Sequence, residues 1–337
     1  MDIDAFINNR TISKNVSFEE VSKSWSGKGL VFLSGGDLYL SNAYMNIRFI
    51  RSLLQSKIPI EIWYLGEEEI NKKLFSAIEK LGGVDFVDAK ERQKIFPMKS
   101  SNLGRIMHEK CPATMEGWRS KSYAILHSRF REVIYLDSDC FLFQKPEDLF
   151  LSSEYLDSKA VFSCDIDLNS HISGRKVDPE TFVVSKLGSF TDRRWDYSKP
   201  NPLWEIVGAK EDELPEFESG FILVDKLEHV DSLFLAWFLN ENSDLTYKHL
   251  YGDKDTFHLA WAKSNARLHM LRDVSRMNGH ISCNYKGSVL FEHRVFDNKF
   301  DCKLRWDCFP NSNSFTSREV FREYFEEAKK MISQKIF

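Results

Sequence analysis

Short apolar runs alternate with amphipathic segments over the first 140 residues of the chain. The runs have the length of buried strands and are bounded by polar or glycine-containing stretches. They are residues 29–33, 60–65, 84–87 and 133–136. Apolar residues recur at helical spacing between them, in residues 41–54, 70–81 and 117–130. Since parallel neighbours need a crossover connection, the pattern predicts an α/β fold with a Rossmann-like, mostly parallel central sheet and helices on both faces.

The second half of the chain is less regular. Residues 151–217 lack clear periodicity and contain four prolines, which predicts loops and short elements. A further buried strand is expected at residues 220–224 and a helix at residues 233–239. Residues 316–337 carry apolar side chains on one side of a helix, which is typical of a helix docked on the body of the protein.

Two acidic residues follow the strand at residues 133–136. Asp137 and Asp139 flank Ser138 at the point where the chain leaves the sheet. Ligands of parallel sheets bind at the carboxyl ends of the strands, and paired carboxylates are hard ligands that suit Mg²⁺ or Mn²⁺. The alternative to metal binding is that one of these aspartates caps the next turn. His293, which follows the apolar run 289–291, is a candidate third ligand, although a lone histidine is more often an ordinary polar residue.

Composition and charge exclude some classes of protein. The 337 residues include 46 basic and 50 acidic ones, a net charge of −4, which disfavours a basic nucleic-acid-binding face. The six cysteines form no CxxC pair, so they fit neither a zinc framework nor a dense disulfide scaffold, and reduced thiols are expected.

The sequence favours a cytoplasmic location. The N-terminus is acidic where a signal peptide would be basic, and no stretch approaches the roughly 18 apolar residues of a membrane span. Peripheral membrane contact through the C-terminal helix is the one membrane role that stays open, and the mixed charges on its polar face weaken that case.

Several segments in the same order resemble the α-mannosyltransferase family typified by fungal Golgi α-1,3-mannosyltransferases (glycosyltransferase family 71). Each is weak alone, but together they cover about residues 29–300. They are Gly29–Leu33, Ile58–Tyr64, Gly117–Ala124, Val133–Asp139, Asn201–Trp204, Glu218–Lys226, Gly252–Phe257 and Leu290–Arg294. Fungal members carry a membrane anchor and stem, which this sequence is not expected to have, so we expect a bacterial or viral cytosolic version.

The resemblance implies a GT-A type fold and a retaining, metal-dependent glycosyltransferase that uses a nucleotide sugar, with GDP-mannose the favoured donor. Asp137, Asp139 and His293 would bind Mn²⁺ or Mg²⁺. The expected nucleotide-sugar contacts are Ser34, Gly35, Gly36, Arg119, Lys121, Asp137, Ser138 and Asp139. Glycines after the first strand would let backbone N–H groups approach the ligand, and a plain tight turn is the alternative.

Other acidic and aromatic residues are candidates for contact with the sugars. Asp253 and Asp255 would bind donor hydroxyls or lie beneath the anomeric carbon, and an exposed loop that starts a helix is the alternative. Glu218 and Gly220 would line the acceptor side. Trp204 is a further stacking candidate, although core packing is the commoner role of such a ring.

We expect one catalytic domain rather than two independent ones. Residues 1–28 would be an N-terminal extension, 29–150 the nucleotide-sugar half, 151–310 the acceptor-side half, and 311–337 a C-terminal amphipathic helix.

Three other functions compete with mannosyl transfer. One is a UDP-glucose or UDP-galactose enzyme of the glycogenin or lipopolysaccharide galactosyltransferase type, although the usual His-x-x-Gly-x-x-Lys-Pro-Trp ending is absent. Another is a sugar-binding relative without catalysis. A two-metal nuclease would need more clustered carboxylates and a basic face.

Overall fold

A computed structural model gives the fold. It describes residues 11–13, 16–17, 21–94, 112–165, 176–177, 184–185, 202–209, 216–241, 243–247, 249–250, 252–277, 280–294 and 315–332. Nearly all of their buried apolar side chains belong to one hydrophobic core.

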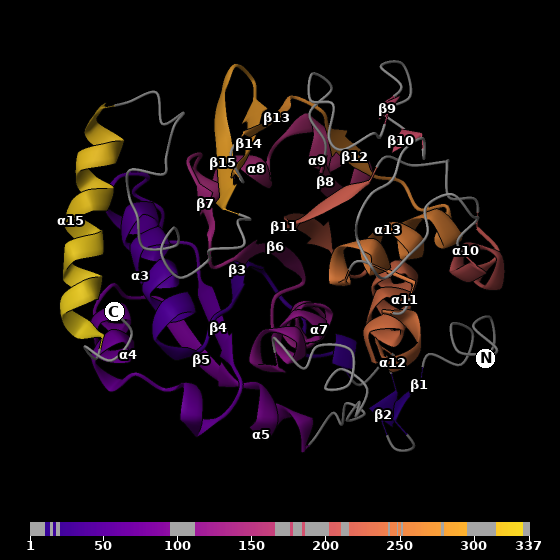
Figure 1. Ribbon diagram of the computed structural model, residues 1–337, viewed down its shortest axis with the longest axis horizontal. Helices are drawn as coiled ribbons and strands as arrows, with labels where there is room; N and C mark the ends of the chain where they lie inside the picture. Colours follow the sequence, from indigo (N-terminus) through magenta and orange to yellow (C-terminus); the bar gives the residue numbers. More distant parts are fainter. Residues whose placement is uncertain are drawn as a thin grey trace.

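A seven-stranded sheet forms the centre of the molecule (Figure 1). Its strand order is β12-β8-β11-β6-β3-β4-β5. The strands are β3 (Lys28–Leu33), β4 (Ile60–Tyr64), β5 (Val84–Asp88), β6 (Glu132–Asp137), β8 (Ala160–Cys164), β11 (Phe217–Asp225) and β12 (His269–Leu271). Only β11 runs antiparallel to its neighbours, β6 and β8. The predicted α/β fold, with a mostly parallel central sheet, is confirmed.

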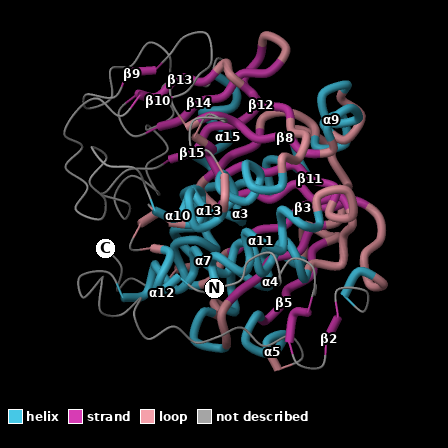
Figure 2. The backbone as a smooth tube through the Cα atoms, turned by 90° about the vertical axis from the view of Figure 1, so that its right-hand side faces the viewer, coloured by secondary structure: helices cyan, strands magenta, loops and turns pink. Residues whose placement is uncertain are grey.

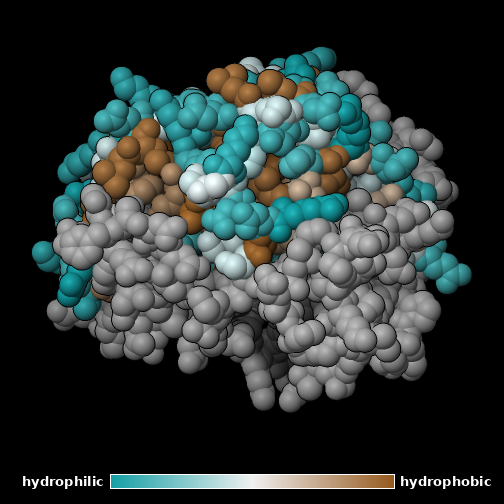
Figure 3. Space-filling model, turned by 90° about the horizontal axis from the view of Figure 1, so that it is seen from above, coloured by the Kyte–Doolittle hydropathy of each residue, from teal (hydrophilic) through white to brown (hydrophobic). Residues whose placement is uncertain are grey.

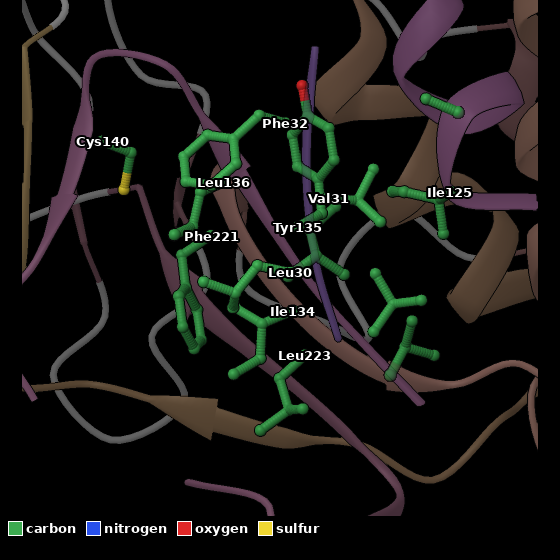
Figure 4. Packing of buried hydrophobic residues seen from close by; sticks show 14 of the residues in the cluster. Leu30, Val31, Phe32, Ile125, Ile134, Tyr135, Leu136, Cys140, Phe221 and Leu223 are labelled. Carbon is green, nitrogen blue, oxygen red and sulfur yellow. The ribbon is translucent and has the colours of Figure 1, made fainter. Parts of the chain in front are cut away.

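The central strands are apolar because both faces of the sheet are covered. Figure 4 shows Leu30, Val31 and Phe32 of β3 beside Ile134 and Leu136 of β6, with Phe221 and Leu223 of β11 nearby. The labelled side chains of these three strands are at most 1% exposed. A side chain of this size contributes about 1.5–3 kcal/mol when it is fully buried, so these strands supply much of the driving force for folding.

Helices cover the sheet on both faces. They are α3 (Gly36–Ser52), α4 (Lys72–Glu79), α5 (Ala89–Gln93), α7 (Pro112–His127), α11 (Val230–Glu241) and α13 (Asp253–Ser264). The chain steps from β3 to β4 to β5 and then returns to β6 on the other side of β3. Because crossovers are right-handed, α3 and α4 lie on one face and α7 on the other, where it packs on α11 and α13. Neighbouring strands β3 and β6 therefore form the topological switch point of the sheet, where open α/β folds bind ligands.

A second, four-stranded sheet adjoins this point. It has the order β13-β14-β15-β7, and all its pairs are antiparallel. The strands are β7 (Cys140–Leu142), β13 (Val274–Met277), β14 (His280–Tyr285) and β15 (Ser288–Arg294). Only Ser138 and Asp139 separate β6 from β7, so the chain passes from one sheet to the other within a single turn.

The amphipathic helix α15 (Phe315–Met331) packs along α3 (Figure 1). Tyr324 is buried there, with its hydroxyl 2.5 Å from Ser52 Oγ. Arg48 of α3 lies over the Tyr324 ring and pairs with Glu323 and Glu327. The predicted docking of this helix on the body of the protein is therefore confirmed.

The remaining described elements are short. They are β1 (Thr11–Ser13), β2 (Val16–Ser17), η1 (Glu67–Glu69), α8 (Pro146–Leu149), α9 (Ser153–Ser158), β9 (Lys176–Val177), β10 (Val184–Ser185), α10 (Pro202–Val207) and α12 (Ser243–Thr246). Figure 2 shows how the helices and strands interleave around the sheets. In Figure 3, hydrophilic residues cover most of the described part of the upper face, with apolar residues in smaller, separate patches.

Cys140, Cys164 and Cys283 are free thiols buried in the core, as the sequence indicated for the cysteines that the structure describes. Within the described residues, no helix has both the length and the apolar character needed to cross a bilayer.

Two details differ from the sequence-based predictions. The first long helix begins at Gly36, whereas the periodicity predicted a start at residue 41, and the Ser41 hydroxyl donates to the Asp37 carbonyl one turn earlier in this helix. The expectation of loops and short elements in residues 151–217 missed the strand β8, which lies inside the sheet next to β11. The apolar run of β8 is only three residues long before Ser163 interrupts it, and the flanking segments show no periodicity, which explains the omission.

Candidate functional site

Two sheets bring the predicted metal ligands together. Asp137 is the last residue of β6, and Asp139 follows in the turn to β7. On β15, His293 is paired in register with Cys140, the residue after Asp139. Since paired residues of an antiparallel ladder lie about 5 Å apart, strand pairing alone places the imidazole beside the two carboxylates.

The donor atoms of these three residues lie within 4.8 Å of one another. His293 Nε2 is 3.5 Å from Asp139 Oδ1 and 3.8 Å from Asp137 Oδ2. Two carboxylates and one imidazole form a donor set that suits Mn²⁺ or Mg²⁺ and leaves coordination positions for a ligand. The residues present therefore fit a divalent cation.

Charge strongly affects the protonation of His293. Burial disfavours the imidazolium, but the Glu218 carboxylate, 2.9 Å from Nδ1, and the nearby Asp139 carboxylate outweigh burial and raise the pKa of His293 to about 10. Burial also opposes ionisation of Glu218, yet the positive ring of His293 lowers the pKa of that carboxyl to about 2. Without a cation at this position, the ring is charged at neutral pH.

Lys121 of α7 links the cluster to a third carboxylate. Its side chain is 4% exposed, and its Nζ lies 3.0 Å from Asp137 Oδ2 and 2.7 Å from Asp253 Oδ2. The ammonium also donates to the Ser219 hydroxyl and carbonyl. Burial lowers the pKa of Lys121, but the two carboxylates outweigh burial and raise it. Lys121 therefore lies within the site as a fixed cation between Asp137 and Asp253.

Tyr135 is a neighbour that sequence reasoning missed. Its hydroxyl donates to Asp137 Oδ1 at 2.8 Å, while Lys121 holds Oδ2. Burial and the charge of Asp137 raise the pKa of Tyr135, so the phenol stays protonated as a donor. The signal was present, because Tyr135 lies two residues before Asp137 on the same face of the strand.

Asp253 and Asp255 occupy the first turn of α13, after Gly252 at the N-cap. Asp253 points into the site, where it contacts Lys121 and accepts a hydrogen bond from Ser219 Oγ at 3.1 Å. Asp255 is partly exposed and lies 3.9 Å from Lys254 Nζ. The structure thus joins Asp253 to the metal-ligand cluster and leaves Asp255 at its edge.

Lys254 belongs to a second ionic cluster beside the first. Its ammonium lies 2.5 Å from Asp165 Oδ2 and 3.4 Å from Glu216 Oε2. Asp165 directly follows β8, just as the predicted ligands follow β6. An acidic residue after an apolar run was the signal that identified Asp137, and it would have identified Asp165 had β8 been predicted.

The loop after β3 lies next to Asp137. Leu33 is in register with Asp137, and Ser34 follows with a buried hydroxyl that has no hydrogen-bond partner among the described residues. Gly36 has φ +67°, and a Cβ on Gly35 would lie 1.8 Å from the Glu69 carboxylate, so both positions need glycine for local reasons. An unpartnered hydroxyl at the switch point is compatible with a ligand, and the nucleotide role of this loop stays a prediction.

Other predicted contacts are less closely tied to the cluster. Arg119 is partly exposed, and because residues two apart on a helix do not share a face, it projects away from the side that presents Lys121. Ser138 is buried in the turn between the two aspartates. Trp204 is 7% exposed and packs edge-on against His258, so core packing, the alternative weighed for this ring, is what the structure shows.

Glu218 and Gly220 were predicted to line the acceptor side, and the structure places them next to His293. Both are buried and lie against His293. Sequence reasoning could not find this contact, because the two segments are 75 positions apart and neither has a metal-binding spacing.

The family model and the similar curated proteins agree on one family. A family model described as "Mannosyltransferase putative" matches residues 27–300. The chain is 24% identical to the α-1,2-mannosyltransferase MNN24 of Candida albicans, over 83% of this chain and 39% of that protein. It is 23% identical to the α-1,3-mannosyltransferase MNN1 of Saccharomyces cerevisiae, over 73% of this chain and 34% of that one. The matches thus span about half or less of these curated relatives' length.

Solved structures are similar at lower identity. The galactosyltransferase LgtC, in complex with donor and acceptor sugar analogs, matches 90% of this chain and 100% of its own, with 14% identity and a TM-score of 0.49. Core-mannan synthase A of Aspergillus fumigatus, in a Mn/GDP form, matches 96% of this chain and 89% of its own, with 12% identity and a TM-score of 0.47.

Proposed function

The chain belongs to the mannosyltransferase family whose model covers residues 27–300, and we propose that it is a metal-dependent retaining glycosyltransferase that transfers mannose from GDP-mannose to a hydroxyl acceptor. The main support is the cluster of Asp137, Asp139 and His293 at the switch point of the sheet. Mannose is the proposed sugar because the similar curated proteins are named α-1,2- and α-1,3-mannosyltransferases.

Asp137, Asp139 and His293 would hold the cation. When bound there, Mn²⁺ or Mg²⁺ supplies Lewis-acid neutralisation of the charge that develops on a departing nucleoside diphosphate. The side chains around it would keep these ligands in place: Tyr135 and Lys121 each occupy one oxygen of Asp137. Ser34 Oγ, in the loop after β3, has no hydrogen-bond partner among the described residues and would donate to a phosphate or ribose oxygen.

The transfer breaks the bond between the anomeric carbon and the diphosphate oxygen and forms one to the acceptor oxygen, whose proton is released. We assign the sugar contact to Asp253, and this assignment is supported by Lys121 and Ser219, which hold its carboxylate beside the ligand cluster. It would accept hydrogen bonds from donor hydroxyls or lie beneath the anomeric carbon, and Asp255 is the second candidate. Retention could proceed by double displacement or by front-face departure of the leaving group, and the position of Asp253 fits both routes.

A donor-hydrolysis screen tests the proposal. The full chain is incubated with GDP-mannose, UDP-glucose or UDP-galactose, with Mn²⁺ or with a chelator. GDP-mannose should be hydrolysed fastest and only with Mn²⁺, and Asp139→Asn should reduce the rate about 100-fold or more. The matched control is Glu79→Gln, an exposed change on α4.

Preference for a uridine donor would overturn the choice of GDP-mannose. Equal rates with and without Mn²⁺ would overturn the metal dependence. If Asp253→Asn and Asp255→Asn both keep normal turnover, neither carboxylate takes part in the chemistry. Nucleotide binding without hydrolysis of any donor would favour the non-catalytic, sugar-binding alternative.

A further inference from the structure

The segment Glu218–Gly220 of β11 departs from regular strand geometry beside His293. The pairing of β11 with β8 shifts register between Glu218 and Ile222. Such irregularities occur next to active sites, where they redirect side chains. Because side chains alternate along a strand, Glu218 and Gly220 face His293, while Ser219 between them contacts Lys121 and Asp253.

The Glu218 carboxylate is held in one orientation. Its Oε1 accepts a hydrogen bond from the Gly220 backbone N–H at 2.6 Å and lies 2.9 Å from His293 Nδ1. An ionised carboxylate can only accept hydrogen bonds, so the proton of this contact is on Nδ1. The other ring nitrogen, Nε2, is the one that faces Asp137 and Asp139.

Glycine at position 220 makes this contact possible. A Cβ there would lie 2.5 Å from His293 Nδ1 and 2.7 Å from Cε1, closer than non-bonded atoms approach. The same Cβ would lie 3.0 Å from Glu218 Oε1. The imidazole therefore occupies the space that any larger residue would fill.

We propose that Glu218 is a positioning residue that keeps the proton of His293 on Nδ1 and thereby directs Nε2 toward a cation held by Asp137 and Asp139. This inference rests on the proposed metal-dependent function. A carboxylate on the far nitrogen fixes the orientation of a ligating histidine and increases its basicity, and removing such a partner weakens metal binding about 10- to 100-fold. Neither the family comparison nor the sequence assigns this role to Glu218.

Metal affinity measured without substrate tests the inference. Free Mn²⁺ is quantified by electron paramagnetic resonance during titration of the full chain. Glu218→Ala should weaken Mn²⁺ binding about 10- to 100-fold, and Glu218→Gln, whose amide oxygen can still accept from Nδ1–H, should restore much of the loss. The matched control is Glu61→Gln, because Glu61 is equally buried and hydrogen-bonded to Trp63 but lies on β4, away from His293.

A second measurement needs no substitution. With ¹⁵N-labelled histidine and diamagnetic Mg²⁺, the Nδ1 resonance of His293 should have the shift of a protonated nitrogen and Nε2 that of a coordinated one. The opposite assignment, or wild-type Mn²⁺ affinity in folded Glu218→Ala, would overturn the positioning role. Failure of the wild-type chain itself to bind Mn²⁺ would instead overturn the metal-dependent function.

Discussion

At the scale of single residues, Lys121 has the most constrained position in the site. Its buried ammonium is shared by Asp137 and Asp253, which belong to different elements. Lys121 was predicted as a nucleotide-sugar contact, whereas the structure shows that its charge already balances two carboxylates. In the absence of ligands, its main effect is therefore on the stability of the site.

Replacing Lys121 by Met should destabilise the protein strongly. The change leaves the buried Asp253 carboxylate without its cation and removes one of the two positive neighbours of the partly buried Asp137, and breaking a buried ion pair from one side costs about 3–5 kcal/mol. Urea unfolding monitored by tryptophan fluorescence measures the loss. Lys73→Met, an exposed lysine of α4, is the control, and a loss below about 1 kcal/mol for Lys121→Met would contradict the expected role.

The stability of the metal-free protein should also depend on the protonation of His293. The pKa of His293 is about 10 in the folded chain and 6.5 when unperturbed. Between pH 6.5 and pH 10, the folded state therefore keeps a proton that the unfolded state has released. This contribution to stability is complete below about pH 6.5 and is lost as pH rises toward 10. Glu218, whose pKa is lowered to about 2 from 4.5, acts oppositely: its contribution is complete above about pH 4.5 and is lost as pH falls.

Thermal unfolding with a chelator present, measured from pH 6 to 10, tests the alkaline part of this dependence. The wild-type chain should lose more stability over this range than His293→Gln, in which the titrating group is absent. Parallel curves for the two proteins would show that His293 does not carry the effect.

Individual site residues differed in how well the sequence identified them. Asp137 and Asp139 stood out because two acids follow an apolar run at a strand end. His293 needed the family resemblance, since nothing local separates it from other histidines. The contact between Glu218 and His293 depends on the pairing of distant strands, which a single sequence does not encode in any short pattern.

At the scale of elements, regular secondary structure was predicted where its periodicity was long or its apolar run was clear. The strands at β3, β4, β5 and β6 and the helices α3, α7 and α15 were found at about the expected places. Their ends shifted by several residues, as at Gly36, because local capping and backbone geometry decide where a helix begins. The strand β8 was missed because its five residues sit between segments without periodicity.

The docking of α15 on α3 leads to a prediction about the stability of the protein. Replacing Tyr324 by Ala removes a buried ring that contacts Arg48 and Ser52, and should cost about 3 kcal/mol of stability. Urea unfolding again gives the value. Arg322→Ala, an exposed position on the same helix, should change stability by less than about 0.5 kcal/mol. Equal effects of the two changes would mean that the helix is not held through Tyr324.

At the scale of the whole molecule, the candidate site belongs to neither sheet alone. The sequence predicted that two halves of the chain would contribute to one cleft, and the structure brings their residues to the switch point between β3 and β6. It could not predict that His293 reaches the site from a separate antiparallel sheet, while Asp253 comes from α13 and Glu218 from β11 of the central sheet. That arrangement follows from the pairing of β7 with β15, a contact between remote segments.

The pairing of β7 with β15 also determines when the site can exist during synthesis. A chain emerging from the ribosome exposes Asp137 and Asp139 long before His293, because the ribosome adds only about 5–20 residues per second. About 150 residues separate Asp139 from His293, so for about 8–30 s the nascent chain presents two carboxylates and a lysine without this imidazole. The strand β7 meanwhile has an unpaired edge, so the arrival of β15 both completes the ligand set and covers a surface prone to pairing with other chains.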